Sequence, residues 1–238
     1  MGRKQEVLSK MKNQILVSCQ AYDPNPHASV ADMVKMAVAA KMGGCVGFRV
    51  NAPEYVSAVR AEVGPDPVII GIWKVKEEGN DVYITTTMEA VAALEAAGAD
   101  VVALDCTDRV NAYGYKGNDL IPQINAQYPD LVIMADCSNA EEGRMALAAG
   151  ADIIASTMSG YTEYTAEKSK KDVDLEFIRE MRKEATAFIL TEGRIWTRED
   201  AVAAFSAGAD CLVIGTAITN PWAITKRFVQ AKAEYFKE

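Results

Sequence analysis

Short apolar runs alternate with amphipathic stretches along the whole chain. In one run, from Pro67 to Trp73, every residue is apolar, Gly or Pro, and Lys74 follows directly. The β-branched content and short length of this run favour a strand buried on both faces over a helix. An Ala-rich helix end, a glycine and a β-branched strand follow one another near residues 39–48, 96–105, 148–157 and 206–215. The pattern therefore predicts repeated helix–loop–strand units.

These units extend over the full sequence. Strands are predicted over residues 15–20, 46–51, 68–74, 101–105, 132–136, 153–157, 188–192 and 212–215. Helices are predicted over residues 29–42, 53–63, 87–97, 119–128, 139–149, 174–184, 198–207 and 221–236, with an extra N-terminal helix over residues 6–12. The pairs Thr86 with Glu89, Ser138 with Glu141, and Thr197 with Asp200 are spaced as helix-capping boxes.

Eight strands that alternate with eight helices indicate a single (β/α)8 TIM barrel over residues 1–238 with an extra N-terminal helix. The 238 residues are close to the roughly 250 typical of such a barrel. The alternative is a doubly wound open sheet, but no Gly-rich dinucleotide fingerprint follows the first strand.

Composition limits the classes of partner. The formal net charge of −8 argues against a nucleic acid or an anionic membrane as partner. No apolar run approaches the ~18 residues that cross a bilayer, and the first residues are polar, so we expect a soluble cytoplasmic protein. The five cysteines stand singly, which favours reduced thiols and disfavours a metal or disulfide framework. The one histidine, His27, directly follows Pro24-Asn25-Pro26 in a predicted turn, so we expect a solvated loop residue.

Candidate chemistry lies where the predicted strands end, because a barrel carries its active site at the C-terminal ends of its strands. The end residues are Gln20, Arg49, Asn51, Lys74, Asp105, Asp136, Thr157, Glu192 and Gly215. A lysine against an apolar wall loses hydration, which lowers its pKa and suits it to act as a base. The alternative is that Lys74 extends into solvent. Arg49, Asp105 and Asp136 could likewise have structural roles, as ion-pair, capping or supporting residues.

The last two strand ends predict a phosphate site. Gly193, and the run from Gly215 through Thr216 to Ala217, offer backbone N–H groups in the loops where barrels frequently bind phosphate. The alternative is that these glycines only form tight turns. The polar loop over residues 159–171 is either a solvated connection or a lid with Gly160 near its hinge.

Eight ordered motifs resemble the bacterial N-acetylmannosamine-6-phosphate 2-epimerase family. They are Ser18-Cys-Gln-Ala21, Gly47-Phe-Arg49, Gly71-Ile-Trp-Lys74, Val82-Tyr-Ile-Thr85, Ala135-Asp136, Ser159-Gly-Tyr-Thr162, Glu192-Gly-Arg-Ile195 and Thr225-Lys-Arg-Phe228. The resemblance implies a phosphate-binding barrel that interconverts N-acetylmannosamine 6-phosphate and N-acetylglucosamine 6-phosphate in sialic acid and amino-sugar catabolism. It implies no cofactor and no metal, and we expect a small-molecule sugar phosphate as partner and a homodimer as a possible assembly.

Residue roles follow from the matching positions. Lys74 would be the acid/base and Glu192 its partner, whereas Gln20, Arg49, Asp136, Tyr83 and Thr85 would bind or orient substrate. Gly193, Arg194, Gly215 and Thr216 would hold phosphate. The chain departs from the family pattern at Trp73, Thr86 and Asn220; the family often has Arg at the last of these, so Arg194 or Arg227 would have to replace that cation.

The chemistry implied by the family agrees with the residues at the strand ends. In the open-chain sugar C2 adjoins the C1 aldehyde, so a base can remove its proton to give an enolate, and reprotonation on the other face inverts the centre. Two alternatives keep the barrel: a Schiff-base aldolase or lyase with Lys74 as nucleophile, and a non-catalytic sugar-phosphate binder.

Overall fold

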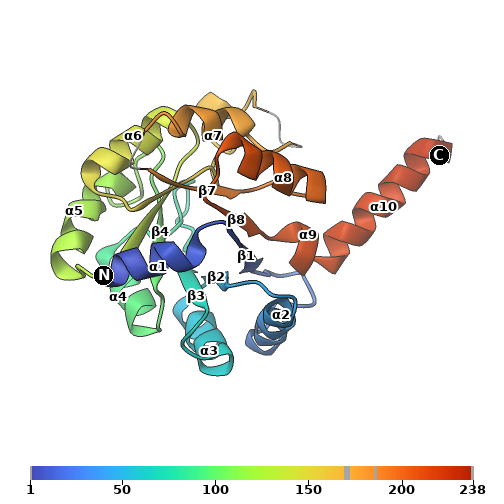
Figure 1. Cartoon of the computed structure of the whole chain (residues 1–238), viewed down its shortest axis with the longest axis horizontal. Helices are drawn as coiled ribbons and strands as arrows, with labels where there is room; N and C mark the ends of the chain where they lie inside the picture. The colour runs from blue at the N-terminus through green and yellow to red at the C-terminus, as the bar shows by residue number, and fades with distance from the viewer. Residues whose placement is uncertain (1, 169–171, 185–186, 237–238) are drawn as a thin grey trace.

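The strands form a closed parallel barrel in the computed structural model, which describes residues 2–168, 172–184 and 187–236. In order around the barrel they are β1 (Gln14–Cys19), β2 (Gly47–Asn51), β3 (Val68–Ile72), β4 (Val101–Asp105), β5 (Val132–Asp136), β6 (Ile153–Ala155), β7 (Phe188–Glu192) and β8 (Cys211–Ile214), and β8 pairs with β1 (Figure 1). The predicted (β/α)8 barrel is confirmed.

Helices surround the barrel (Figure 1). They are α1 (Arg3–Met11), α2 (Val30–Met42), α3 (Pro53–Val63), α4 (Met88–Ala96), α5 (Gly117–Gln127), α6 (Ala140–Ala149), α7 (Leu175–Met181), α8 (Arg198–Ala207), α9 (Thr216–Thr219) and α10 (Pro221–Phe236). The N-terminal helix is confirmed, whereas α9 was not expected from the sequence.

Several predicted boundaries were wrong by one or two residues. β3 ends at Ile72, before Lys74, and β6 ends at Ala155, before Thr157, because the chain there leaves the ladder of its neighbours. The caps of α4 and α6 are Thr87 and Asn139, each one residue later than predicted, and their side chains accept from the third backbone N–H that follows. The predicted capping box of Thr197 with Asp200 is confirmed.

Alternation along each strand separates two apolar layers. Residues such as Ile70, Met134 and Leu190 point into the barrel, where Val7 and Met11 of α1 close one end. Their neighbours in sequence point outward and pack against the helices. Because side chains repeat every two residues, Arg49 of β2, Asp136 of β5 and Glu192 of β7 all belong to inward rows, near the C-terminal ends of their strands. These three side chains therefore meet at the top of the packed interior.

The repeated Gly-Ala-Asp sequence has a structural explanation at the opposite end of the barrel. Asp100, Asp152 and Asp210 accept hydrogen bonds from the backbone N–H groups of Ile69, Ile133 and Ile189 on a neighbouring strand, at 3.0, 2.9 and 2.9 Å. The same carboxylates bind Arg60, Lys4 and Arg182, at 2.5, 2.8 and 2.5 Å. Each motif thus joins two strands by a charge-assisted hydrogen bond.

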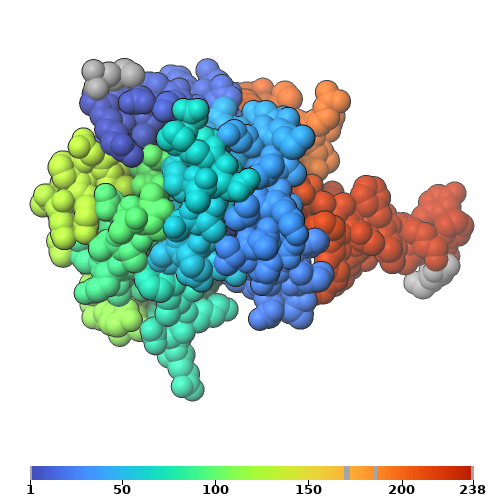
Figure 2. Space-filling view, turned by 90° about the horizontal axis from the view of Figure 1, so that it is seen from below, coloured from blue at the N-terminus to red at the C-terminus, as the bar shows by residue number. Residues whose placement is uncertain are grey.

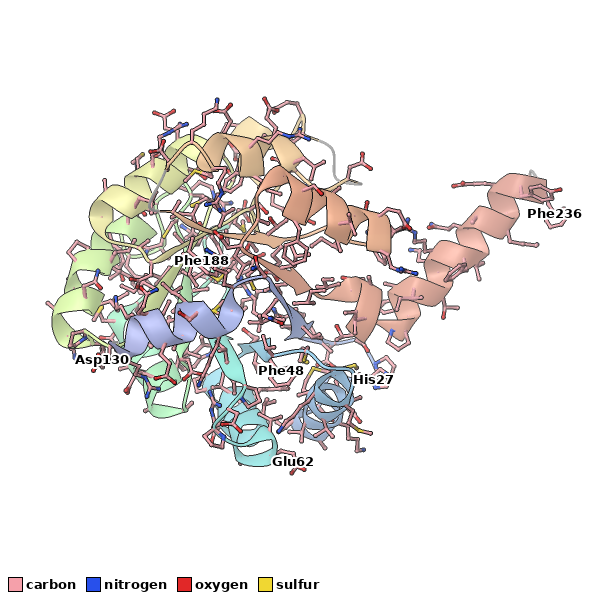
Figure 3. The ribbon with its side chains drawn as sticks, in the orientation of Figure 1. His27, Phe48, Glu62, Asp130, Phe188 and Phe236 are labelled. Carbon is pink, nitrogen blue, oxygen red and sulfur yellow. The ribbon has the colours of Figure 1, made fainter. Side chains whose placement is uncertain are left out.

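Helix α10 departs from the barrel pattern. It projects away from the body of the molecule, with Phe236 near its far end (Figures 2 and 3). None of its residues is buried, and Phe228 is 73% exposed. Over the described residues, no helix combines the length and the apolar character that crossing a membrane would require.

Candidate active site

A cavity of about 630 Å³ opens at the C-terminal ends of the strands. Nine of the predicted site residues line it: Gln20, Arg49, Lys74, Tyr83, Glu192, Gly193, Arg194, Gly215 and Thr216. Thr85 and Asp136 are not part of its wall and are 1% and 0% exposed. The strand ends therefore bring most of the predicted site together, with Asp136 directly beneath it.

Arg49 is the centre of the ionic cluster at the cavity floor. Its Nη1 donates to Asp136 Oδ1 at 3.0 Å and to Glu192 Oε2 at 2.6 Å, and its Nη2 donates to Asp136 Oδ2 at 2.5 Å. The Thr157 hydroxyl donates to Asp136 at 2.7 Å. Arg49 is itself 1% exposed, so this cluster is almost entirely removed from water.

Opposing effects set the protonation states of this cluster. Burial opposes ionisation of Arg49, but the adjacent Asp136 and Glu192 carboxylates raise its pKa further above its ordinary value. Burial raises the pKa of Glu192, and the charge of Asp136 adds to this, while Arg49 acts in the opposite direction. Arg49 thus stays charged, and Glu192 is easier to protonate than an exposed glutamate.

Lys74 lies on the same cavity wall. Its Nζ donates to Gln20 Oε1 at 2.9 Å and lies 5.3 Å from the centre of the Tyr22 ring. Gln20 is itself held, because its Nε2 donates to Ser18 Oγ at 2.8 Å and its Oε1 accepts from the Tyr22 hydroxyl at 2.8 Å. The amine is therefore held at a defined place and does not extend freely into solvent.

The surroundings of Lys74 favour its neutral form. Burial and then the positive charge of Arg49 lower its pKa to about 8, although Glu192 and Asp136 act in the opposite direction. On the order of a tenth of the amine is consequently unprotonated at pH 7, far more than for an ordinary lysine. This is the property that a general base requires.

Some of the predicted strand-end residues hold the backbone of neighbouring segments in place. Thr85 Oγ1 accepts from the Trp73 backbone N–H at 3.0 Å, and Asn51 Oδ1 accepts from the Lys74 backbone N–H at 2.8 Å. Asp105 is 2% exposed and binds Thr107 at 2.5 Å and Arg109 at 3.0 Å. Asn51, Thr85 and Asp105 are absent from the cavity wall because their side chains are occupied in holding neighbouring loops.

The predicted phosphate end of the cavity contains Gly193, Arg194 and the start of α9. Gly193 has a φ of +103°, which suits a glycine turn, and Arg194 follows it with a φ of +62°. Arg194 Nη1 donates to the Ser159 carbonyl at 2.9 Å. Asn220 lines the cavity, and its Oδ1 accepts from the Ala223 N–H at the start of α10.

Aromatic wall residues were missed by the sequence analysis. Tyr22, Tyr161, Trp196 and Trp222 line the cavity, and the Arg227 guanidinium lies 4.6 Å from the Trp196 ring centre. For Tyr22, Tyr161 and Trp196 the available signal was their place in loops that follow strand ends, whereas Trp222 lies in the first turn of α10. His27 lies in the loop before α2 and is not on the wall (Figure 3).

The loop after β6 is anchored at several points. Ser159 Oγ donates to Asp174 Oδ2 at 2.5 Å, and Lys168 binds the same oxygen at 2.7 Å. Thr162 and Thr165 are each 3% exposed, and Tyr164 donates to the buried Glu142. The last part of the predicted lid, residues 169–171, lies outside the described residues.

Nowhere among the described residues do three His, Cys, Asp or Glu side chains group so that they could hold a metal ion.

Comparisons with known proteins agree with this geometry. The family described as "Putative N-acetylmannosamine-6-phosphate epimerase" matches residues 33–234. A relative from Caldanaerobacter subterraneus subsp. tengcongensis, named "Putative N-acetylmannosamine-6-phosphate 2-epimerase", is 42% identical over 94% of this chain and 93% of its own. One from Cutibacterium acnes with the same name is 40% identical over 97% of this chain and 98% of its own.

Solved structures give the same result. The N-acetylmannosamine-6-phosphate 2-epimerase from Clostridium perfringens matches with a TM-score of 0.88 and 36% identity, over 94% of this chain and 95% of its own. A thiamine phosphate pyrophosphorylase from Pyrococcus furiosus, with a TM-score of 0.61 and 16% identity over 92% of this chain and 93% of its own, shares the fold alone. The extent of the match, over nearly the whole chain, places this protein in the N-acetylmannosamine-6-phosphate epimerase family.

Proposed function

We propose that this protein is an isomerase that inverts C2 of N-acetylmannosamine 6-phosphate to give N-acetylglucosamine 6-phosphate. The observation that carries the proposal is the Lys74 amine, which has a pKa of about 8 and is held by Gln20 at the wall of the cavity. The names of the relatives and of the Clostridium perfringens structure support this choice of substrate.

Lys74 acts as the base on the open-chain sugar. Its neutral amine takes the C2 proton, the C–H electron pair moves toward C1, and the aldehyde oxygen becomes an enolate oxygen. Return of a proton to the opposite face of C2 inverts the centre and restores the aldehyde. Only protons move, so the reaction requires no redox cofactor.

Glu192 accepts and returns the hydroxyl proton of the sugar during ring opening and closure. Burial raises its pKa, so it accepts a proton more readily than an exposed glutamate, and the 2.6 Å hydrogen bond from Arg49 fixes its position. Arg49 also places a permanent positive charge at the cavity floor, which stabilises the enolate. Asp136 acts from beneath by orienting Arg49, because it lies outside the cavity wall.

The phosphate group binds at the other end of the cavity. Gly193, Arg194, Gly215 and Thr216 line this end, and Arg194 is the charged residue among them. Binding energy from a remote phosphate orients the reacting carbon at Lys74. Tyr83 borders the cavity near Lys74 and contacts the sugar, whereas the buried Thr85 does not reach it.

Proton NMR in D₂O tests the reaction directly. Incubation of N-acetylmannosamine 6-phosphate with the enzyme should produce the N-acetylglucosamine epimer, with loss of the C2–H signal as solvent deuterium enters. Epimer formation with full retention of the C2 proton would contradict the proposal. Borohydride trapping of substrate on Lys74, with cleavage products in place of the epimer, would instead establish the Schiff-base alternative.

The partner of this protein is a second copy of itself. In a (β/α)8 barrel the last helix belongs to the outer ring, but α10 projects away from it (Figure 1). Ile15 of β1 and Ile214 of β8 are only partly buried. Each copy therefore has one projecting helix and, on the outer face of β1 and β8, apolar residues that are only partly covered. Exchange of α10 between two copies covers both, including Phe228 and Val229.

Sedimentation velocity at micromolar concentration checks this assembly. We expect a dimer for the parent and for Gln230→Glu, and a shift toward monomer for Phe228→Asp, because the introduced carboxylate would lose hydration at the interface. A parent protein that sediments as a monomer would contradict the assembly and leave the epimerase proposal intact.

A further inference from the structure

Lys74 lies on a short arm beyond the end of β3. The arm pairs residues 73–75 with residues 83–85 in antiparallel fashion, with Lys74 opposite Ile84. The Val75 N–H donates to the Tyr83 carbonyl at 3.0 Å, and the Thr85 N–H donates to the Trp73 carbonyl at 2.9 Å. The placement of the amine over the cavity therefore depends on how this arm is fastened to the barrel.

Thr85 fastens the base of the arm on one side. Its Oγ1 accepts from the Trp73 N–H at 3.0 Å, so both backbone groups of Trp73 bond to this one residue. Thr85 has a φ of +49°, which is rare for a β-branched side chain and persists only where the surroundings require it. At 1% exposure its side chain has no access to a ligand in the cavity.

Asn51 fastens the arm on the other side. The β2–β3 ladder ends with Asn51 beside Ile72, and the backbone of β2 then turns away at Ala52, whose φ is +71°. The N–H of Lys74, two residues beyond Ile72, donates to Asn51 Oδ1 at 2.8 Å. A side-chain oxygen thus takes the place of the missing backbone acceptor.

We propose that Asn51 and Thr85 are positioning residues that hold the Lys74 amine over the reacting carbon. This inference rests on the proposed function, since it assigns to Lys74 the role of base. Both residues act through the backbone of residues 73 and 74, and neither contacts the substrate. Side-chain acceptors extend the sheet by two residues beyond its backbone ladder, and this carries a lysine to a point that the β3 strand alone does not reach.

Loss of either acceptor has two consequences. An unpaired N–H at residue 73 or 74 lets the arm shift, and a misplacement of about 1 Å is enough to cost roughly 10²-fold in rate. A lysine that moves toward water regains hydration, so its pKa rises toward the ordinary value of 10.5. A merely structural role would reduce thermal stability without moving this pKa.

The test compares variants that differ in one acceptor. Thr85→Val keeps the branched shape and removes the oxygen, whereas Thr85→Ser keeps the oxygen. Asn51→Leu removes the second acceptor independently, in case Thr85→Val does not fold. Thr86→Val makes the same chemical change one residue further along and serves as the matched control. Circular dichroism and thermal melting confirm that each variant is folded at the assay temperature.

Two readouts decide the proposal. For Thr85→Val and Asn51→Leu we expect kcat to fall by roughly 10- to 100-fold with KM within about threefold of the parent, and Thr85→Ser and Thr86→Val to stay near parental. In protein labelled with ¹³C at the lysine ε-carbons, the resonance that Lys74→Met removes should titrate near 8 in the parent and at higher pH in both variants.

Unchanged titration and unchanged kcat in the folded Thr85→Val and Asn51→Leu proteins would overturn the proposal. The titration needs no turnover, so it still decides whether these residues position Lys74 if the parent proves to have no epimerase activity. A parent without activity would contradict the proposed function alone.

Discussion

Arg49 and Asp136 form a bidentate ion pair at the top of the barrel interior, with Nη1 donating to Oδ1 at 3.0 Å and Nη2 donating to Oδ2 at 2.5 Å. Both side chains are at most 1% exposed. The pair fixes the plane of the guanidinium, and Nη1 then reaches Glu192 on the cavity wall at 2.6 Å. The position of a proposed catalytic carboxylate thus depends on a residue that the substrate does not contact.

Asp136→Asn should lower both stability and activity. Replacing the carboxylate leaves the buried Arg49 charge without its closest partner, which costs about 3–5 kcal/mol when a buried pair is broken. The freed guanidinium also no longer holds Glu192 in place. Denaturant unfolding and kcat of the variant measure the two effects. The exposed Asp130→Asn is the matched control, and equal behaviour of the two variants would contradict this account.

Lys74→Met should abolish turnover and stabilise the fold. Loss of the base should lower the epimerisation rate by roughly 10²- to 10⁴-fold. Because the folded protein lowers the pKa of Lys74 from 10.5 to about 8, the charged amine opposes folding below pH 8. The uncharged Met side chain should therefore raise the free energy of unfolding, by on the order of 1–3 kcal/mol at pH 7.

The stabilisation should depend on pH in a defined direction. The unfolded chain binds the Lys74 proton more tightly than the folded one, so the stability of the parent rises between pH 8 and 10.5. The difference between Lys74→Met and the parent should therefore shrink across this window. Lys76→Met, at an exposed position just beyond the arm, is the control; an equal trend in both variants would rule out Lys74 as its source.

The pH–rate profile should report the same group. If neutral Lys74 removes the C2 proton, kcat/KM should rise roughly tenfold per pH unit below about pH 8 and level off above it. Initial rates over pH 6–9 at constant ionic strength check this expectation. A profile that is flat through this range would exclude Lys74 as the titrating base.

Glu192→Gln should slow the reaction less severely than Lys74→Met. The amide keeps the size of the side chain but cannot carry a proton, so the enzyme loses assistance with ring opening. Sugars open slowly without a catalyst, so the open-chain form still reaches Lys74. We expect C2–H exchange in D₂O to persist at a reduced rate in this variant and to be absent in Lys74→Met. Complete loss of exchange in Glu192→Gln would make Glu192 essential for the proton transfer at C2.

Arg194→Ala should weaken recognition of the phosphate group. The parent should turn over N-acetylmannosamine 6-phosphate with a kcat/KM orders of magnitude above that for the unphosphorylated sugar, since the remote dianion supplies orienting energy. Removal of the Arg194 guanidinium should narrow this ratio. Arg198→Ala, at the exposed start of α8, is the control. A ratio that is unchanged in Arg194→Ala would place the phosphate elsewhere in the cavity.

The sequence by itself determined the barrel and the end of it at which most of the predicted site residues meet. Apolar strands alternate with capped helices, and the two-residue repeat brings Arg49 and Glu192 to one end of the barrel whatever the details of packing. The Gly-Ala-Asp repeat could also be recognised in the sequence, because it stands at the same position before three strands and joins each of them to its neighbour. These features depend on residues that are close in sequence or at equivalent positions of neighbouring strands.

Only the tertiary structure decided how individual side chains are used. Thr85 and Asp136 lie at strand or arm ends like the proposed catalytic residues Lys74 and Glu192, but burial and long-range partners direct their side chains away from the cavity. The arm that carries Lys74 continues past β3 because Asn51, 23 residues earlier in the chain, supplies the acceptor. Likewise, the exposure of α10 depends on where the whole helix is placed, which its own amphipathic sequence leaves undetermined.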